Sequence, residues 1–385
     1  MSPVLFISRM ELRRILTLRP VFSVMILAVV IYAGFFPQPY LAEALRDVPI
    51  ALVDLDGSDS SRMFARRLDA SADVAIVAAL PDVATAQREV FVRSLHGILV
   101  IPKFFERDLL HGRGAPLALY ADASYFLIYS RISGAVTALA RTMGAEIEAK
   151  RLVAAHVDPD LAAAATDPVP LTAIPLFNPQ GGYATYILPA AFVLLLQQTL
   201  LMGVGLLGTY PNEWEQGARD RRIGAFDRVI GRLLAYLVVQ AFTVSFYLIV
   251  LPYLYGIPRI GSIGPLAAVA FPFILAVAGL GMLMARLLRN PALVQLIAAG
   301  LGMPFIFMAG FAWPAEAMPE MLKTIAIAIP STSAINALVN LGQMGASLQD
   351  VGSHVLTLSS LAVIYCGLAV LLEAKAGAEP RPEMI

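Results

Sequence analysis

The sequence predicts a polytopic α-helical membrane protein with six transmembrane helices and an inserted α/β extracytoplasmic domain. The first observation is composition: 58% of the 385 residues are hydrophobic and the mean hydropathy is +0.72, which is too apolar for a soluble protein of this length. The second is charge: Tyr183–Thr209 and Leu233–Pro258 carry no Asp, Glu, Lys or Arg, and each exceeds the roughly 20 residues that cross a bilayer. The third is a change of character across residues 37–182, where short strand-like and helix-like runs alternate.

Residues 1–19 mix arginines with leucines at helical spacing, which predicts an amphipathic helix at the cytoplasmic membrane interface. Residues 20–36 form the first transmembrane helix, and the arginines before it indicate that it starts in the cytoplasm. A cleaved signal peptide is the alternative, because Ala42-Glu43-Ala44 has the form of a cleavage site. The two prolines between the apolar run and that site disfavour cleavage.

Residues 37–182 are expected to form a folded α/β domain of ordinary size, followed by a proline-rich return to the membrane. The expected strands are Ile50–Val53, Val74–Ala79, Gly97–Ile101 and Leu117–Tyr120, and the expected helices are Ser60–Leu68, Val83–Ser94 and Tyr125–His156. The run Val53-Asp54-Leu55-Asp56-Gly57-Ser58-Asp59 also resembles a calcium-binding loop. Its glycine is at the fourth position and Ala65 stands where the closing Glu belongs, so a turn leading into a capped helix is favoured.

Residues 183–373 are expected to form a five-helix transmembrane bundle, and residues 374–385 a cytoplasmic tail. The predicted spans are Tyr183–Gly208, Leu233–Gly256, Ile263–Ala285, Pro291–Ala312 and Val351–Leu372. The segment 313–350 is mostly apolar but interrupted at Pro330, which favours two short helices dipping into the outer leaflet over a seventh and eighth span.

The distribution of positive charge orients this topology. Eleven arginines lie in the segments assigned to the cytoplasm before the first span and between the later spans: Arg9, Arg13, Arg14, Arg19, Arg219, Arg221, Arg222, Arg228, Arg232, Arg286 and Arg289. The short outside loops carry only Arg259 and Lys323. The positive-inside rule therefore predicts that both termini are cytoplasmic and that residues 37–182 lie outside.

Several functional classes are excluded or disfavoured. Net charge is zero, which argues against a nucleic-acid partner. None of the four lysines follows a glycine, so the chain has no P-loop for ATP. The histidines lack metal-ligand spacing, Cys366 is the single cysteine, and no Asp, Glu, Lys or Arg lies within the predicted spans. Gln197, Gln198 and Gln295 are notable polar side chains there, and interhelical hydrogen bonding is favoured over substrate contact for them.

The polar segment 210–232, YPNEWEQGARDRRIGAFDRVIGR, lies between two apolar runs and is expected to be cytoplasmic. One interpretation is that it receives energy from a partner; the other is a solvated connector whose charges only set topology. Charge-free spans, no nucleotide site and this inward loop together favour transport powered by a separate subunit.

The whole chain resembles the permease subunit of type-2 ATP-binding-cassette (ABC) transporters, in the subgroup with a large outside domain between the first two spans. Four passages carry the resemblance: Val53–Ser58 followed by Ser61-Arg62; Glu213–Ala218, similar to E-x-E-x-G-[TA]; Gly231-Arg232; and the outer segment containing Gly310-Phe311, Pro314, Met318-Pro319 and Pro330-Ser331-Thr332. The chain departs from the family in lacking a Thr-Pro pair after Gly217, which puts the detailed docking geometry in doubt.

The resemblance implies that the loop forms a coupling helix on an ABC ATPase subunit. The expected coupling residues are Glu213, Trp214, Glu215, Gln216, Gly217, Ala218 and Arg219. No cofactor is expected to bind directly, because the partner would hydrolyse ATP. Membrane lipid surrounds the expected complex, and pairing as a homodimer or with a similar permease stays open, as does a periplasmic adaptor protein.

The expected function is therefore that of a bacterial inner-membrane ABC exporter permease for an amphipathic, drug-like or lipid-like substrate. Catalytic and metal sites are not expected, and no residue is assigned to substrate binding. The alternatives are a membrane-anchored sensor or scaffold whose outside domain binds a ligand or partner, and a membrane-embedded enzyme, for which no catalytic cluster is visible.

Overall fold

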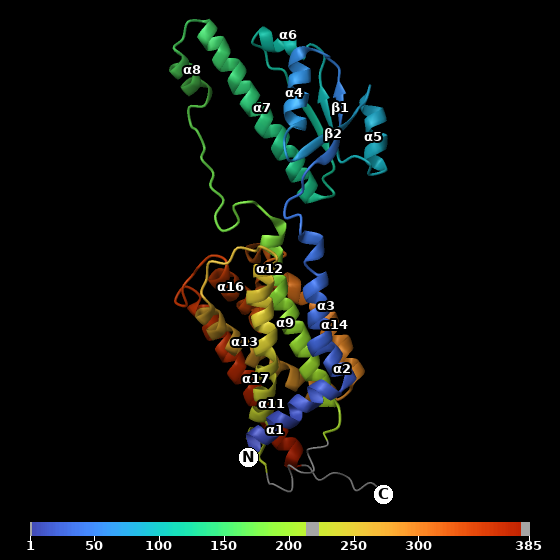
Figure 1. Cartoon of the computed structure of the whole chain (residues 1–385), viewed down its shortest axis with the longest axis vertical. Helices are drawn as coiled ribbons and strands as arrows, with labels where there is room; N and C mark the ends of the chain where they lie inside the picture. Colours follow the sequence, from blue (N-terminus) through green and yellow to red (C-terminus); the bar gives the residue numbers. More distant parts are fainter. Residues whose placement is uncertain (1, 213–222, 379–385) are drawn as a thin grey trace. The chain divides into compact units, whose positions relative to one another are not determined.

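A computed structural model describes residues 2–212 and 223–378 of the chain, with side chains to Lys375. It divides into two compact units, one formed by Met1–Glu43 with Pro175–Ile385 and the other by Ala44–Ile174. The second unit is somewhat shorter than the predicted domain of residues 37–182. Figure 1 gives the element labels used below.

The first unit is helical and begins with α1 (Pro3–Thr17), whose first turn is capped by the Ser2 hydroxyl accepting from the Leu5 amide. Leu18 is extended and Pro20 follows in the first turn of α2 (Arg19–Phe22), so the chain turns at this point into the first apolar helix. A π-helical turn (Ser23–Leu27) joins α2 to α3 (Ala28–Phe35). These three pieces make one continuous candidate span, Arg19–Tyr40.

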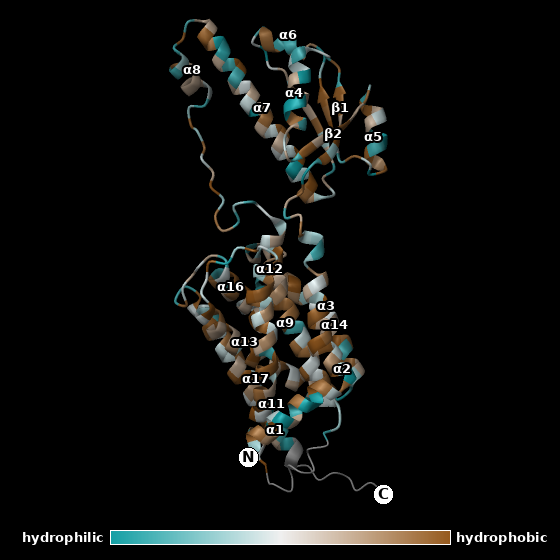
Figure 2. Ribbon diagram, viewed as in Figure 1, coloured by the Kyte–Doolittle hydropathy of each residue, from teal (hydrophilic) through white to brown (hydrophobic). Residues whose placement is uncertain are grey.

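Five further helices in the described residues are long and apolar enough to cross a membrane, which makes six and agrees with the predicted number. They are α9 (Tyr183–Thr209), α11 (Ala225–Ser245) continued through a π-helical turn (Phe246–Val250) into α12 (Leu251–Leu254), α13 (Ile263–Leu288), α14 (Pro291–Met308) and α17 (Gly352–Ala378). Hydrophobic residues cover most of α9, α13 and α14, whereas α1 carries both hydrophobic and hydrophilic residues (Figure 2).

Helices α9 and α13 form the centre of this unit, since most of the apolar length of each is buried. They approach closely because small residues lie between them: a Cβ atom built on Gly281 would be 2.9 Å from Cβ of Val204. Gly279 lies equally close to α17 at Tyr365 and Cys366. Close backbone approach at small residues is a usual way for helices to associate in membranes.

The segment between α14 and α17 contains a short 3-10 turn (Ala315–Ala317) and two short helices, α15 (Glu320–Ile327) and α16 (Pro330–Gly342). The two helices meet at 84° across a break of two residues, and Pro330 begins the second. The predicted interruption thus lies where the sequence places it. Its position in the outer leaflet stays a prediction.

The second unit contains a four-stranded sheet of β1 (Val48–Asp54), β2 (Val74–Ala79), β3 (Gly97–Ile101) and β4 (Ala118–Ala121). The strand order is β2-β1-β3-β4, with β1 parallel to β2 and β3, and β4 antiparallel to β3. Its helices are α4 (Asp59–Asp69), α5 (Val83–Phe91), α6 (Phe105–Leu110), α7 (Phe126–Ala154) and α8 (Pro159–Thr166). The sequence analysis did not predict α6 and α8.

The sheet is covered on both faces. On one face, α4 and α7 bury Phe64 and Ile132 against Leu99. On the other, α5 buries Ala86 against Val53. All five residues of β3 are buried, which explains why it is a continuous apolar run. The unit is therefore a three-layer α/β fold. That it lies outside the cytoplasm stays a prediction.

The acidic run after β1 forms a turn that leads into a capped helix, as expected. The Asp54 carboxylate accepts hydrogen bonds from the amides of Asp56 (3.0 Å) and Gly57 (2.9 Å), and the Ser58 hydroxyl caps α4. A hydrogen bond with Ser58 lowers the pKa of Asp56 below its usual value. Gly57 has a φ of +62°, which suits glycine.

Candidate functional site

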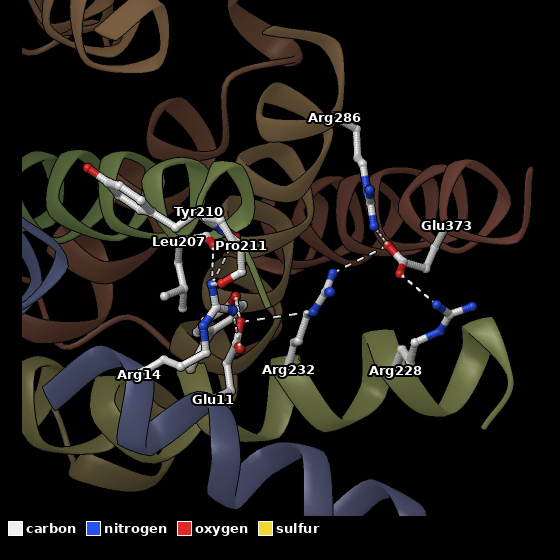
Figure 3. Close-up of polar contacts among 10 residues, drawn as sticks. Glu11, Arg14, Leu207, Tyr210, Pro211, Arg228, Arg232, Arg286 and Glu373 are labelled. Carbon is white, nitrogen blue, oxygen red and sulfur yellow. Dashed lines mark hydrogen bonds and ion pairs between the residues drawn. The ribbon is translucent and has the colours of Figure 1, made fainter. Parts of the chain in front are cut away.

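The residues expected to couple to an ATPase, Glu213–Arg219, lie outside the described residues, so their role stays a prediction. Both ends of the loop that contains them are described: Tyr210–Asn212 follows α9, and Ile223 and Gly224 precede α11. Because α11 begins at Ala225, the last eight residues of the predicted loop 210–232 are helical, and this helix starts before the predicted Leu233. The candidate site consists of these two ends and the buried polar side chains that hold them (Figure 3). We call it the loop anchor. Its side chains come from α1, α11, α13 and α17.

At the upstream end, Arg14 of α1 holds the terminus of α9. One Nη atom of Arg14 donates to the carbonyl oxygens of Leu207 (3.0 Å), Tyr210 (3.1 Å) and Pro211 (3.4 Å). The last carbonyl groups of a helix have no partner within the helix, and its C-terminal end carries partial negative charge. Arg14 therefore satisfies these groups and ties the end of α9 to α1. A 2.9 Å ion pair with Glu11 orients the guanidinium.

At the downstream end, Glu373 of α17 holds the start of α11. Arg228 and Arg232 lie one helical turn apart, which directs both toward the same carboxylate. Their Nη1 atoms lie 3.4 Å and 3.3 Å from the two oxygens of Glu373. Arg286, near the end of α13, also pairs with Glu373. One carboxylate thus joins the ends of α11, α13 and α17.

Arg232 also faces Glu11 of α1, whose carboxylate lies 3.9 Å from Nε of the arginine and accepts a 2.9 Å hydrogen bond from the Tyr236 hydroxyl. The residues Glu11, Arg232 and Glu373 are only 1%, 5% and 2% exposed. Four guanidinium groups therefore share two carboxylates in a largely dehydrated place. Because the arginines outnumber the carboxylates, removal of either Glu11 or Glu373 would leave buried positive charge poorly compensated.

Helix α1 packs against the downstream end as well. Ile7 is fully buried and packs with Ile223, the first described residue after the gap. A Cβ atom built on Gly231 would lie 2.7 Å from Cβ of Ile7, so only glycine allows this close approach of α11 to α1. Through Arg14 on one side and Ile7 on the other, α1 contacts both ends of the loop.

The loop anchor links helices that are distant in the sequence. Its charged groups are paired arginines and carboxylates, and the Tyr236 hydroxyl donates to Glu11. Across residues 2–212 and 223–378, no three His, Cys, Asp or Glu side chains gather in a way that would hold a metal ion. Because both described ends of the loop meet these contacts, a movement of the loop would act on α9, α11 and α1 directly, and on α13 and α17 through Glu373.

The anchoring roles of Glu11 and Glu373 were not predicted from the sequence. Arg14, Arg228 and Arg286 were assigned only to topology, and Arg232 to topology and to the motif Gly231-Arg232. The sequence feature that could have indicated these roles is the absence of other acidic residues nearby. Glu11 is the sole acidic residue in positions 1–42, and Glu373 is the sole one in positions 351–375. A single carboxylate in a long segment without other acidic residues indicates a specific partner, because an unpaired one is costly to bury.

Two of the three glutamines singled out in the spans make interhelical hydrogen bonds. The Gln197 side-chain oxygen accepts from the Ser331 amide at the start of α16 (2.7 Å), and the Gln198 side-chain amide donates to the Ala298 carbonyl of α14. This agrees with the expected role. Gln295 is exposed on α14.

Known proteins match this chain over most of its length. The family model described as ABC-2 family transporter protein matches residues 19–371. The Probable multidrug ABC transporter permease YbhS of Escherichia coli K12 is 26% identical over 202 residues, which are 51% of this chain and 52% of that protein. This match therefore spans about half the length of the curated relative.

A second relative is matched over a longer range. The Linearmycin resistance permease protein LnrN of Bacillus subtilis 168 is 23% identical over 327 residues, covering 79% of this chain and 82% of that protein. The family match and the six apolar helices agree in describing a multi-pass membrane protein. The chain belongs to the ABC-2 family of transporter proteins.

Proposed function

We propose that this chain is the permease subunit of an ABC exporter, in which a separate ABC ATPase subunit docks on the loop 210–232. The observation that carries the proposal is that both ends of this loop are tied by side-chain contacts to other helices, the upstream end to α1 and the downstream end to α1 and α17. If the loop only set the topology, its charges would need to be exposed to water, but its ends would not need contacts of this kind. Family membership also favours transport over a sensor, scaffold or enzyme.

In the proposed mechanism, ATP binding closes the ATPase subunits and moves the loop. Because Arg14 holds the end of α9 and Glu373 holds the start of α11, the movement would reorient those helices relative to each other. Glu213–Arg219 would form the coupling helix. This chain would supply no nucleotide-binding group of its own, and two permeases, identical or similar, would operate with two ATPase subunits.

The proposed substrate is an amphipathic small molecule that leaves the cytoplasm or the inner leaflet. Two observations support this class. The relatives are named for multidrug transport and linearmycin resistance. The apolar helices also carry few charged groups away from their ends, which suits an apolar solute better than an ion. We further propose that the chain lies in the inner membrane with both termini in the cytoplasm and the α/β unit outside.

The test is copurification of the ATPase subunit with loop variants, alongside substrate-stimulated ATP hydrolysis in liposomes. Glu213→Ala with Glu215→Ala should weaken association partially, because exposed charge contacts are each worth about 0–1 kcal/mol. Gly217→Val should weaken it more, since a β-branched side chain restricts a turn or close backbone approach. Asp160→Ala with Asp167→Ala, two exposed acidic residues of the α/β unit, is the matched control. Normal binding and transport by both loop variants would reduce the loop to a connector.

A further inference from the structure

The α/β unit contains a cavity of about 650 Å³ between α7 and the connection from α6 to β4. This volume lies within the range of about 300–1,000 Å³ typical of small-molecule pockets. Its floor is apolar and comes from four elements: Phe64 of α4, Leu109 of α6, Leu119 of β4 and Met143 of α7. Figure 1 shows α7 running beside α4 on the same side of the sheet.

Helix α7 gives the cavity two kinds of wall. Val136, Ala140, Met143 and Ile147 recur at helical spacing and supply an apolar stripe. Thr137, Arg141, Gly144, Glu148 and Arg151 form the adjacent stripe, which is polar. The space beside Gly144 is open, because a Cβ atom built there meets no other atom within 4 Å. The cavity therefore has an apolar side and a charged side.

The charged side is positive. Three arginines line it, Arg113, Arg141 and Arg151, and of the described lining residues Glu148 alone carries a carboxylate. Glu148 pairs with Arg151 at 2.6 Å. Within the described part of the chain, Arg113 and Arg141 make no ion pair, and both are exposed. Two guanidinium groups are thus available to an acidic group, which they bind with good geometry.

We propose that this cavity binds an amphipathic organic anion, whose apolar body lies on the floor and whose carboxylate or phosphate contacts Arg113 and Arg141. An uncharged apolar ligand would leave the arginines without a partner, and a purely polar anion would leave the floor exposed to water. This inference goes beyond the proposed function, since it concerns binding by the α/β unit and requires neither ATP nor an ATPase subunit.

The experiment uses the full chain in nanodiscs of neutral phosphatidylcholine, without an ATPase. A fatty acid bearing a diazirine is added, irradiated, and located by mass spectrometry of the cross-linked peptides. Cross-links should fall in residues 109–119 and 136–151. Arg113→Gln with Arg141→Gln should lower this labelling roughly tenfold, the effect of about 1.4 kcal/mol of lost charge-assisted binding. Arg66→Gln, an exposed arginine of α4 outside the cavity, should leave it unchanged.

A second variant fills the cavity. Gly144→Phe places a ring in open space and should abolish labelling of the same peptides. Gly134→Phe is its control, because Gly134 is also on α7 with open space around it but does not line the cavity. Repeating the labelling in phosphatidylglycerol nanodiscs distinguishes the source of the anion: a decrease there identifies membrane lipid as an occupant, and unchanged labelling identifies a free amphiphile.

Three results would overturn the proposal. These are cross-links confined to the apolar helices of the first unit, labelling that neither Gly144→Phe nor the double arginine variant reduces, and equal cavity labelling by the methyl ester of the probe, which lacks the acidic group. If Gly144→Phe fails to elute as native protein, the arginine variant decides alone, because it changes only exposed side chains.

Discussion

Arg232 of α11 and Glu373 of α17, 141 positions apart in the chain, form a buried ion pair of 3.3 Å at the end of the membrane helices. Arg228 and Arg286 share the same carboxylate. Through these ion pairs and the contact of Arg232 with Glu11, α1, α11, α13 and α17 are connected by side chains. This connection begins at the loop that we propose to receive the ATPase, so its disruption should affect both stability and coupling.

Replacing Glu373 tests the energetic part of this relationship. Glu373→Ala leaves Arg228, Arg232 and Arg286 without their shared carboxylate, and breaking a buried pair in this way costs about 3–5 kcal/mol. We expect the lower end of that range, since Arg286 is partly exposed and able to turn toward water. The measurement is thermal denaturation in detergent followed by size-exclusion chromatography. Lys375→Ala, an exposed residue two positions further along α17, is the control. Equal melting temperatures for the two variants would contradict the account.

Replacing Gly231 tests the contact between α1 and α11. Gly231→Ala puts a methyl group 2.7 Å from Cβ of Ile7 and 2.9 Å from the Val4 carbonyl oxygen, so one helix must move. Overpacking of this kind costs about 1–3 kcal/mol, partly offset by the better helix propensity of alanine. Since α1 contacts both loop ends, we also expect weaker copurification of the ATPase subunit. Gly367→Ala in α17, where a Cβ meets nothing within 4 Å, should be neutral or stabilising. Tight packing at Gly231 is refuted if the two variants melt alike.

Single cysteines test the proposed orientation. In a Cys366→Ala background, Ser124→Cys in the α/β unit should react with a membrane-impermeant maleimide from outside intact cells. Gly217→Cys in the loop and Lys375→Cys at the end of α17 should react only after the membrane is opened. The physical reason is the excess of arginines in the segments assigned to the cytoplasm. Labelling of all three positions from outside would show that the orientation is wrong.

The number of membrane helices and the positions of the four strands were predictable because they depend on local pattern. Apolar runs of sufficient length indicate membrane helices whatever surrounds them, and the six helices agree with those expected. The break at Pro330 and the turn at Asp54–Ser58 were likewise found from residues close in sequence. The helix α6 was missed because six residues are too few for a clear periodic pattern.

The sequence by itself thus determined that this is a membrane protein with six apolar helices, a polar loop between the second and third, and an inserted α/β unit. Only the tertiary structure decided that Arg232 pairs with both Glu11 and Glu373 and that α1 packs closely against α11 at Gly231. It also decided that arginines line one side of a cavity with an apolar floor. These are contacts between side chains far apart in sequence, whose partners depend on how helices pack and not on the local pattern. The hydropathy of a segment indicates which residues are buried. It does not indicate which residue of another helix pairs with a buried charge, and that pairing is what offsets the cost of burying it.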